Sequence, residues 1–155
     1  MVEKNRVEAE KDEKYMRLAL EEAKLALEAD EVPIGAIIVA GGRIVGRGHN
    51  LVETLVDVTA HAEIQAITAA SSTIGGKYLN DCTLYVTVEP CPMCAGAIAM
   101  SGIERVYFGA YDLRMGCAGS VYSLPEDSAL GVHIPCVGGV CEQDCAKLVN
   151  DFFTV

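Results

Sequence analysis

The chain has 155 residues, of which 51% are hydrophobic and 22% charged, and its formal net charge is −10. This length and balance predict one globular domain, with an aliphatic core because only 6% of residues are aromatic and tryptophan is absent. The acidic charge argues against non-specific binding to nucleic acid, although 12 lysines and arginines leave room for a local basic surface.

The composition also bears on location and on the role of the cysteines. The first residues, MVEKNRVEAEKDEKY, contain no apolar segment of the kind found in signal peptides. No apolar run approaches the length of a membrane span. We therefore expect a cytoplasmic protein with no membrane partner, in which thiols stay reduced. Seven cysteines in such a protein suggest metal binding, catalysis or packing rather than a disulfide framework.

The predicted elements follow one another without a repeat, so residues 1–155 are interpreted as a single domain. Residues 1–12 are highly charged and are expected to fray. Apolar residues at helical spacing predict a first helix over 13–29. The segment 34–48 is predicted to form a β-hairpin around Gly41-Gly42, and 51–60 a polar loop.

In the second half of the chain, helices alternate with strands. The predictions are a helix from about His61, a strand at 82–88, a helix at 92–102, a strand at 105–110, a loop over 111–131, a strand within 132–137 and a helix over 141–153. A hairpin followed by such units implies an α/β fold with three α/β/α layers and a five-stranded mixed sheet. Ligands of these sheets bind beyond the carboxyl ends of the strands, and Cys91 lies just there.

The stretch VEPCPMCAG, residues 88–96, contains a Cys-x-x-Cys pair, Cys91 and Cys94. Such a pair can be a redox couple, half of a structural zinc site or part of a catalytic zinc site. A redox couple is expected in a thioredoxin-like context, which the preceding segments do not match. A structural zinc site needs a second pair at similar spacing, and CEQDC at 141–145 has the wrong interval.

A catalytic site needs a third ligand and a neighbouring acid/base, and the stretch TAHAEIQA supplies His61 and Glu63. Two cysteines and one histidine are an accepted zinc ligand set that leaves the fourth position to water. Zinc lowers the pKa of this water to about 7, and a carboxylate within reach can transfer its proton. We therefore assign His61, Cys91 and Cys94 as ligands of one zinc ion per chain and Glu63 as the proton shuttle. Both His61 and Cys91 fall at predicted helix starts, where the helix dipole favours thiolate and hydroxide.

The pattern His61-Ala62-Glu63 followed by Pro90-Cys91-Pro92-Met93-Cys94 is the signature of zinc-dependent nucleobase deaminases. Within that superfamily the chain resembles the bacterial tRNA-specific adenosine deaminases, which make inosine at the wobble position of the anticodon. The resemblance extends from about Glu31 to Ser120. It includes the blocks EVPIGAIIV, GRGHN, TAHAEI, LYVTVEPCPMCAGA, FGAYD and GCAGS.

The resemblance implies a cytidine deaminase-like fold and several substrate contacts. Asn50 would hydrogen-bond the edge of the base, and Ala62 would offer its backbone N–H to it. Asp112 would contact the substrate ribose or a nearby loop, and Pro33 and Ile34 would help to form the wall of the base pocket. The resemblance also implies that the partner is tRNA, bound through its anticodon stem-loop, and that the protein is a homodimer.

Some features depart from the family pattern. The chain ends in NDFFTV without a basic tail, Val58 stands where proline is usual, and the segment 111–115 carries only one positive charge, on Arg114. The acidic net charge of −10 also motivates an alternative, a deaminase of a free base or nucleoside such as guanine or cytosine. Another is a non-catalytic RNA-binding subunit, which the presence of Glu63 disfavours.

Two further groups of residues have only general expectations attached to them. The candidates for contacts with phosphate groups are Arg43, Arg47, Lys77, Arg105, Arg114 and Lys147. The cysteines outside the Cys-x-x-Cys pair are expected to be packing residues: Cys82, Cys117, Cys136, Cys141 and Cys145.

Overall fold

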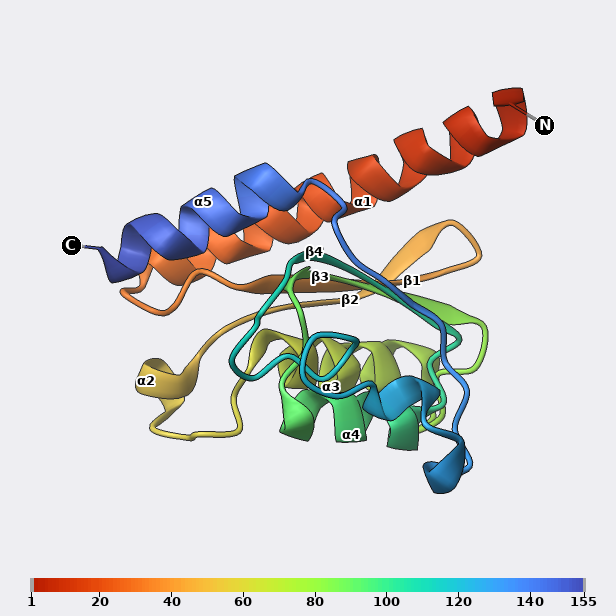
Figure 1. The fold of residues 1–155 in the computed structure, drawn as a ribbon. Helices are drawn as coiled ribbons and strands as arrows, with labels where there is room; N and C mark the ends of the chain where they lie inside the picture. Colours follow the sequence, from red (N-terminus) through yellow and green to blue (C-terminus); the bar gives the residue numbers. More distant parts are fainter. Residues whose placement is uncertain (1, 155) are drawn as a thin grey trace.

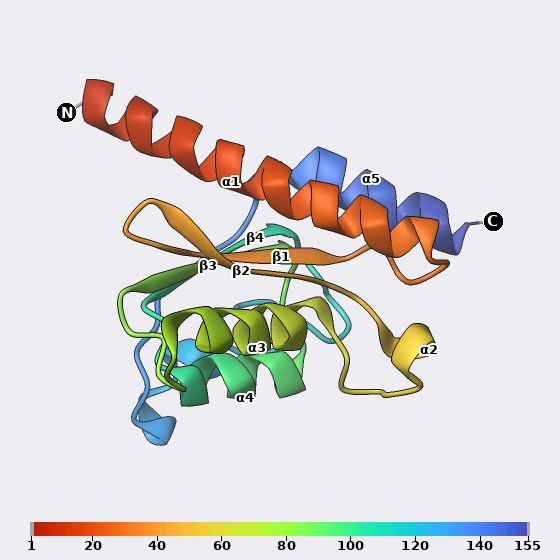
Figure 2. The ribbon, with the colours of Figure 1, turned by 180° about the vertical axis from the view of Figure 1, so that it is seen from behind.

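A computed structural model describes residues 2–154, which form three layers (Figure 1). A five-stranded sheet lies in the middle. Helices α1 (Val2–Glu28) and α5 (Glu142–Phe153) cover one face, and α3 (Ala62–Ile74) and α4 (Pro92–Ser101) cover the other. Figure 2 shows the same layers from behind. The predicted α/β fold with three layers is confirmed.

The sheet is mixed, as expected. Its strands are β1 (Gly35–Ala40), β2 (Arg43–His49), β3 (Cys82–Val88), β4 (Arg105–Ala110) and β5 (Cys136–Val137), in the spatial order β2-β1-β3-β4-β5. Strand β1 is antiparallel to both β2 and β3, whereas β3, β4 and β5 run parallel. Helix α4 supplies the crossover that the parallel pair β3–β4 requires. The carboxyl ends of β3 and β4 therefore meet at one edge of the sheet.

Both faces of the central strands are buried, and alternate residues contribute to two separate cores. Ala36 and Ile38 of β1 pack toward α3 and α4, whereas Ile37 and Val39 pack toward α1 and α5. Strand β3 follows the same rule, with Tyr85 on the α1 side. This period of two on a strand covered from both sides explains the nearly continuous apolar sequence of β1.

Helix α3 lies directly on β2 because the residues between them are small. A Cβ atom at Gly48 would lie 2.5 Å from the carbonyl oxygen of Ala62 and 2.5 Å from the nitrogen of Ala66. A Cβ atom at Gly46 would lie 2.5 Å from the carbonyl oxygen of Ala66. Only glycine permits a helix backbone to approach a strand this closely. The two glycines therefore fix the position of the first turn of α3, where the predicted site begins.

The charged amino-terminal segment differs from the prediction. It was expected to fray, but it is helical from Val2, so α1 is 27 residues long and extends past the edge of the sheet (Figures 1 and 2). Good helix formers, the pair Arg6–Glu3 and a hydrogen bond from the Tyr85 hydroxyl to Oδ1 of Asp12 at 2.7 Å support it. No helix within residues 2–154 combines the length and apolar character that crossing a membrane requires.

Two predicted irregular segments contain short helical turns. The segment 51–60 includes α2 (Val52–Leu55), and the segment 111–131 includes 3-10 turns at Leu124–Glu126 and Ser128–Leu130. Strand β5 has only two residues, which is shorter than predicted. The N–H of Ile134 bonds to the carbonyl of Pro125 instead of to the sheet, and Pro135 has no N–H to donate.

Candidate active site

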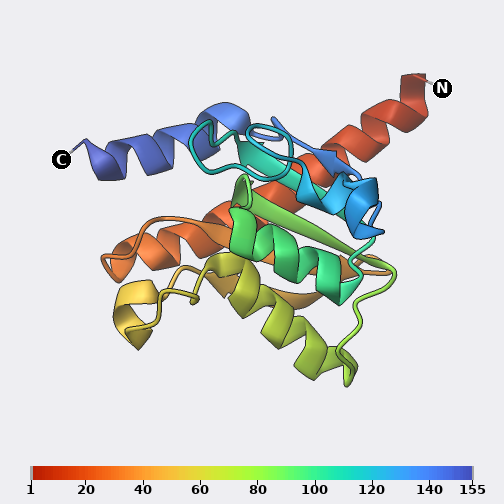
Figure 3. The same ribbon diagram turned by 60° about the horizontal axis from the view of Figure 1, so that its bottom comes forward.

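Helices α3 and α4 lie side by side and begin at the same edge of the sheet (Figure 3). His61 is the residue that precedes α3, and Cys91 is the residue that precedes α4; both have extended backbones. The sulfur of Cys91 accepts the N–H of Cys94 at 3.5 Å, as a serine hydroxyl does at other helix starts. The positive ends of both helix dipoles therefore meet at the predicted metal ligands.

The three predicted ligands are at distances suited to zinc. Nδ1 of His61 is 3.5 Å from Sγ of Cys91 and 3.6 Å from Sγ of Cys94. In a tetrahedral site with Zn–S bonds of about 2.3 Å and Zn–N bonds of about 2.0 Å, nitrogen and sulfur ligands are about 3.5 Å apart. The three ligand atoms lie within 4.8 Å of one another, and no other such group is found in residues 2–154. The donor set and its spacing fit one zinc ion with a fourth position left to water.

The proton affinities of these groups depend on one another. The Cys94 thiol and His61 lower the pKa of Cys91 to about 4, against the opposing effect of burial. Contact with Cys91, together with burial, raises the pKa of Cys94. The hydrogen bond with Cys91 also raises the pKa of His61. Cys91 is therefore a thiolate at neutral pH, which is the form that binds metal.

Glu63 lies in the first turn of α3, two residues after His61 and outside the ligand group. The residue is only 4% exposed, and burial raises the pKa of its carboxyl group to about 7. A group whose pKa is near neutral pH both takes and returns protons readily. The structure thus places a carboxyl group with a near-neutral pKa beside the predicted metal ligands, and the role of Glu63 as the proton shuttle stays a prediction.

A cavity of about 560 Å³ opens onto this site, a volume typical of small-molecule sites. His61, Glu63 and Cys91 form part of its lining. The rest comes from the segments before β1 and after β2, the start of α3, the ends of β3 and β4, and the end of α5: Asp30, Glu31, Val32, Ile34, Asn50, Val52, Glu53, Ala62, Val88, Glu89, Asp112, Arg114, Met115, Val149, Phe152 and Phe153.

Four of the five predicted substrate-binding residues line this cavity: Ile34, Asn50, Ala62 and Asp112. The backbone N–H of Asn50 bonds to the carbonyl of Ile34, but its buried side-chain Oδ1 has no hydrogen-bond partner within residues 2–154. A buried acceptor without a partner is costly, so it is suited to a donor on a ligand. Ala62 is the first residue of α3, and its N–H is not used by the helix.

Pro33 and Asp112 differ from the other three predicted residues. Pro33 is buried and is not among the described residues that line the cavity. Asp112 lines the cavity, but its Oδ1 accepts the N–H groups of Arg114 and Met115 at 3.0 Å each. Its observed role is therefore to hold the turn at 112–115, and a contact between Asp112 and a substrate stays a prediction.

Two buried carboxylates that the sequence analysis did not single out hold the loops on the two sides of the cavity. Glu31 is 1% exposed and accepts the N–H groups of Glu53 at 3.0 Å and Thr54 at 2.7 Å, and the Thr54 hydroxyl. Glu89 is 3% exposed and accepts bonds from the segment 112–120. The available signal for Glu89 was its position directly before Pro90-Cys91.

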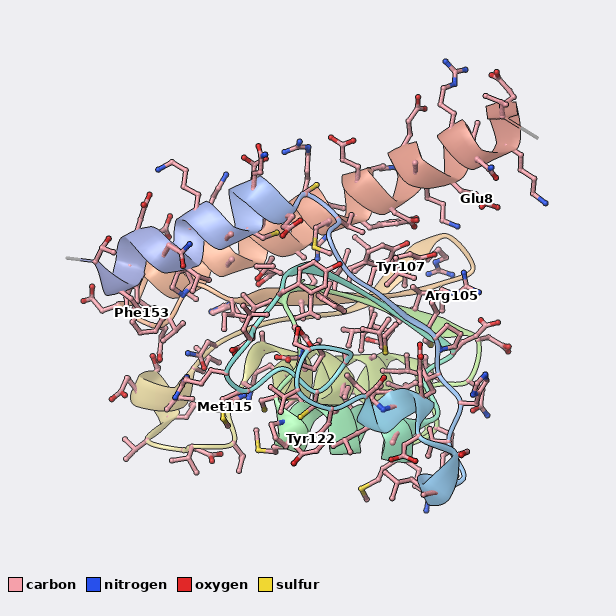
Figure 4. The ribbon with its side chains drawn as sticks, in the orientation of Figure 1. Glu8, Arg105, Tyr107, Met115, Tyr122 and Phe153 are labelled. Carbon is pink, nitrogen blue, oxygen red and sulfur yellow. The ribbon has the colours of Figure 1, made fainter. Side chains whose placement is uncertain are left out.

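Most of the candidate phosphate contacts lie away from the cavity. Arg114 is the only one of the six that lines it. Arg105 begins β4 and Arg43 begins β2, at the edge of the sheet opposite the site. Figure 4 shows Arg105 far from Met115 and Phe153, which line the cavity. Lys147 pairs with Asp151 at 2.6 Å on the exposed side of α5.

The five remaining cysteines are placed as packing residues. All seven thiols are free, and Cys82, Cys117 and Cys145 are buried. The sulfur of Cys145 packs against Gly109, where a Cβ atom would approach it to 2.3 Å. The thiol of Cys136 donates to the carbonyl of Ile134 at 3.5 Å, and the thiol of Cys145 donates to the carbonyl of Val140 at 4.0 Å.

Comparison with known proteins agrees with this geometry. The family model for the cytidine and deoxycytidylate deaminase zinc-binding region matches residues 9–110. The tRNA-specific adenosine deaminase of Bacillus subtilis (strain 168) is 46% identical over 142 residues, which are 92% of this chain and 88% of that protein.

Similar solved structures are also deaminases. One from studies of A-to-I editing by tRNA:A34 deaminases is 41% identical, with a TM-score of 0.83 over 87% of this chain and 98% of that chain. The guanine deaminase of Bacillus subtilis is 40% identical, with a TM-score of 0.61 over 64% of each chain. The chain therefore belongs to the zinc-dependent cytidine and deoxycytidylate deaminase family, in the group that includes the tRNA-specific adenosine deaminases.

Proposed function

We propose that this protein hydrolyses the 6-amino group of adenosine at the wobble position of a tRNA anticodon, giving inosine and ammonia. The observation that carries the proposal is the Cys₂His group with Glu63 beside it, of which His61, Cys91 and Glu63 line a cavity. Relatives that are 46% and 41% identical over most of this chain are described as acting on tRNA.

The residues present divide the reaction among themselves. His61, Cys91 and Cys94 would hold a zinc ion, which would lower the pKa of a water molecule and so supply hydroxide at neutral pH. Glu63 takes the proton of the attacking water and returns it to the leaving nitrogen, so that water and adenosine become inosine and ammonia. Oδ1 of Asn50 accepts a hydrogen bond from the base, and the N–H of Ala62 donates one to it.

The charges around the cavity favour a base over a phosphate as its occupant. Within residues 2–154, Arg114 is the only lysine or arginine in the lining, whereas six carboxylate residues contribute to it. The phosphates of a polynucleotide must then stay outside while the target base enters, as in enzymes that extrude a base from the stack. Phe153, 66% exposed at the mouth, offers a ring on which a neighbouring base can stack.

We also propose that the protein is a homodimer located in the cytoplasm, where bacterial tRNA is modified. Helix α4 buries Cys94, Ala95 and Ile98 against the sheet, yet its opposite face is apolar as well. Met100 on that face is 81% exposed. A helix that is apolar on both faces is normally buried on both. Sedimentation of Met100→Lys beside the wild-type chain tests this: a dimer that becomes a monomer supports the interface, and a wild-type monomer contradicts it.

The substrate is tested by incubating the zinc-loaded protein with a tRNA that carries adenosine at the wobble position. Sequencing of the cDNA is expected to show guanosine there. In parallel, ammonia release is measured with free guanine, cytosine and adenosine, because a guanine deaminase is among the similar structures. Editing of tRNA without turnover of the free compounds supports the proposal. Turnover of a free base without editing of tRNA contradicts it.

A further inference from the structure

We infer that Glu89 is a positioning residue that clamps the segment 112–120 against the cavity, and that this clamp sets the affinity for the substrate without holding the metal. The inference rests on the proposed function for the identity of the substrate, whereas the clamp itself is argued from the contacts within this chain. Glu89 lies in the cysteine motif of the sequence, and neither zinc binding nor proton transfer explains why it is there.

The contacts of Glu89 account for both of its carboxylate oxygens. Oε1 accepts the N–H of Asp112 at 3.1 Å and the hydroxyl of Ser120. Oε2 accepts the N–H of Ala118 at 3.1 Å and that of Ser120 at 2.9 Å. All four partners are donors, and an ionised carboxylate is acceptor-only on both oxygens. A glutamine here would turn an NH₂ group toward N–H donors, although it has the same shape.

Gly116 is part of the same clamp. A Cβ atom at this position would lie 2.4 Å from the carboxyl carbon of Glu89 and 2.5 Å from its Oε1. The backbone of the loop therefore wraps the carboxylate so closely that only glycine permits the approach. The N–H of Cys117 also bonds to the carbonyl of Pro90 at 2.8 Å. The loop is thus hydrogen-bonded to both of the residues that precede Cys91, Glu89 and Pro90.

The clamped loop carries cavity residues but no metal ligand. Asp112, Arg114 and Met115 line the cavity, and Arg114 is the only lysine or arginine among the described residues that do so. The metal ligands are held separately at the starts of α3 and α4. Releasing the clamp should therefore move the substrate-facing side chains and leave the zinc site in place.

Kinetics with Glu89→Gln test the inference, together with zinc analysis and hydrogen exchange. We expect about one zinc per chain, a KM for tRNA raised roughly tenfold or more with a much smaller change in kcat, and faster exchange in 112–120 while α3 stays protected. Roughly tenfold is the effect of one buried donor losing its acceptor. Ile103→Val, a conservative change in the core, is the control for a general loss of stability.

Two further variants keep the test decisive. Ser120→Ala removes only the hydroxyl contact, so it should fold and give a smaller change in KM than Glu89→Gln. Gly116→Ala disturbs the same contact by placing a methyl group against the Glu89 carboxylate. Combining it with Glu89→Gln should therefore raise KM little more than either change alone. Additive effects would contradict a shared clamp.

The outcomes separate this inference from the proposed function. If wild-type protein edits tRNA and Glu89→Gln changes KM no more than Ile103→Val, or loses its zinc, the clamp is refuted and the function stands. If wild-type protein makes no inosine, the function is refuted. Hydrogen exchange then decides the clamp: faster exchange confined to 112–120 supports it, and unchanged exchange overturns it.

Discussion

The metal centre and the rim of the cavity, which we define as segments 51–60 and 111–120, are held by different interactions. At the metal centre, His61 and Cys91 stand at the starts of two regular helices packed on the sheet. At the rim, two buried carboxylates, Glu31 and Glu89, hold loops by accepting their N–H groups. Both parts line one cavity, but a mutation can disrupt either of them without disrupting the other. The order of effects expected from mutation follows from this division.

The largest effect is expected from removing a metal ligand. Cys91→Ala leaves two ligands, too few for a zinc site, so both bound zinc and deamination should be lost. Metal analysis and the tRNA assay on the same preparation check this. Cys82→Ala, a buried thiol outside the site, is the control and should keep its zinc. An active Cys91→Ala enzyme would show that the metal assignment is wrong.

Removing the proton shuttle should abolish the chemistry while sparing the metal. Glu63→Ala is expected to retain about one zinc per chain and to lose about 10²- to 10⁴-fold in kcat, the usual range for a general acid/base. The expectation follows from the position of Glu63 outside the ligand group. Glu63→Gln, which keeps the volume, should be as inactive. Loss of zinc from both variants would mean that Glu63 helps to bind the metal.

A third change disturbs the metal centre through its scaffold. A side chain at Gly48 meets the backbone of α3 at 2.5 Å, so Gly48→Val should push the helix away from β2 and destabilise the fold by about 1–3 kcal/mol. Zinc affinity should fall with it. Gly76→Val is the matched control, because nothing lies within 4 Å of that position. Urea unfolding measures the stability of both variants, and an equal loss of stability in the two would contradict the packing argument.

The smallest effect, and the one most specific to the rim, is a change in pH dependence. Burial alone would raise the pKa of Glu31, but the hydrogen bonds from Thr54 and Glu53 outweigh it and lower that pKa. A lowered pKa contributes stability that is present above the ordinary value of 4.5 and is lost as the pH falls through the folded-state value.

Glu31→Gln should therefore be less stable than the wild type at pH 7 by about 1–3 kcal/mol, and this gap should shrink as the pH falls below about 4.5. Unfolding in urea at pH 7, 5 and 4 measures the gap. Glu28→Gln, at an exposed position of α1, is the control. A difference in stability between the two proteins that does not change with pH would show that the ionised Glu31 carboxylate does not stabilise the rim.

The same division explains what the sequence could predict. The three predicted metal ligands, which the structure brings together, and the candidate Glu63 follow from residue type and spacing. The strands at 82–88 and 105–110 agree with the prediction because their apolar runs end at turn residues. The rim does not follow from such signals. Glu31 and Glu89 are single acids, which in most sequences are solvated, and only the folded chain brings their donors to them.

Other differences also arise from tertiary contacts. The extension of α1 to Val2 depends partly on the bond between Asp12 and Tyr85, which are 73 residues apart in the chain. Pro33 was expected at the cavity beside Ile34, but only Ile34 lines it. Pro33 and Ile34 both lie just before β1, and the sequence does not show which of them faces the cavity. The packing around them decides this.

The central claim is that a zinc site and Glu63 deaminate adenosine in tRNA, and one measurement tests it most directly. Wild-type protein and Glu63→Ala, matched for zinc content, are incubated with the same tRNA, and inosine at the wobble position is quantified. The account predicts conversion by the wild type and at least about a hundredfold less by the variant. Equal conversion by the two proteins, or none by the zinc-loaded wild type, would contradict it.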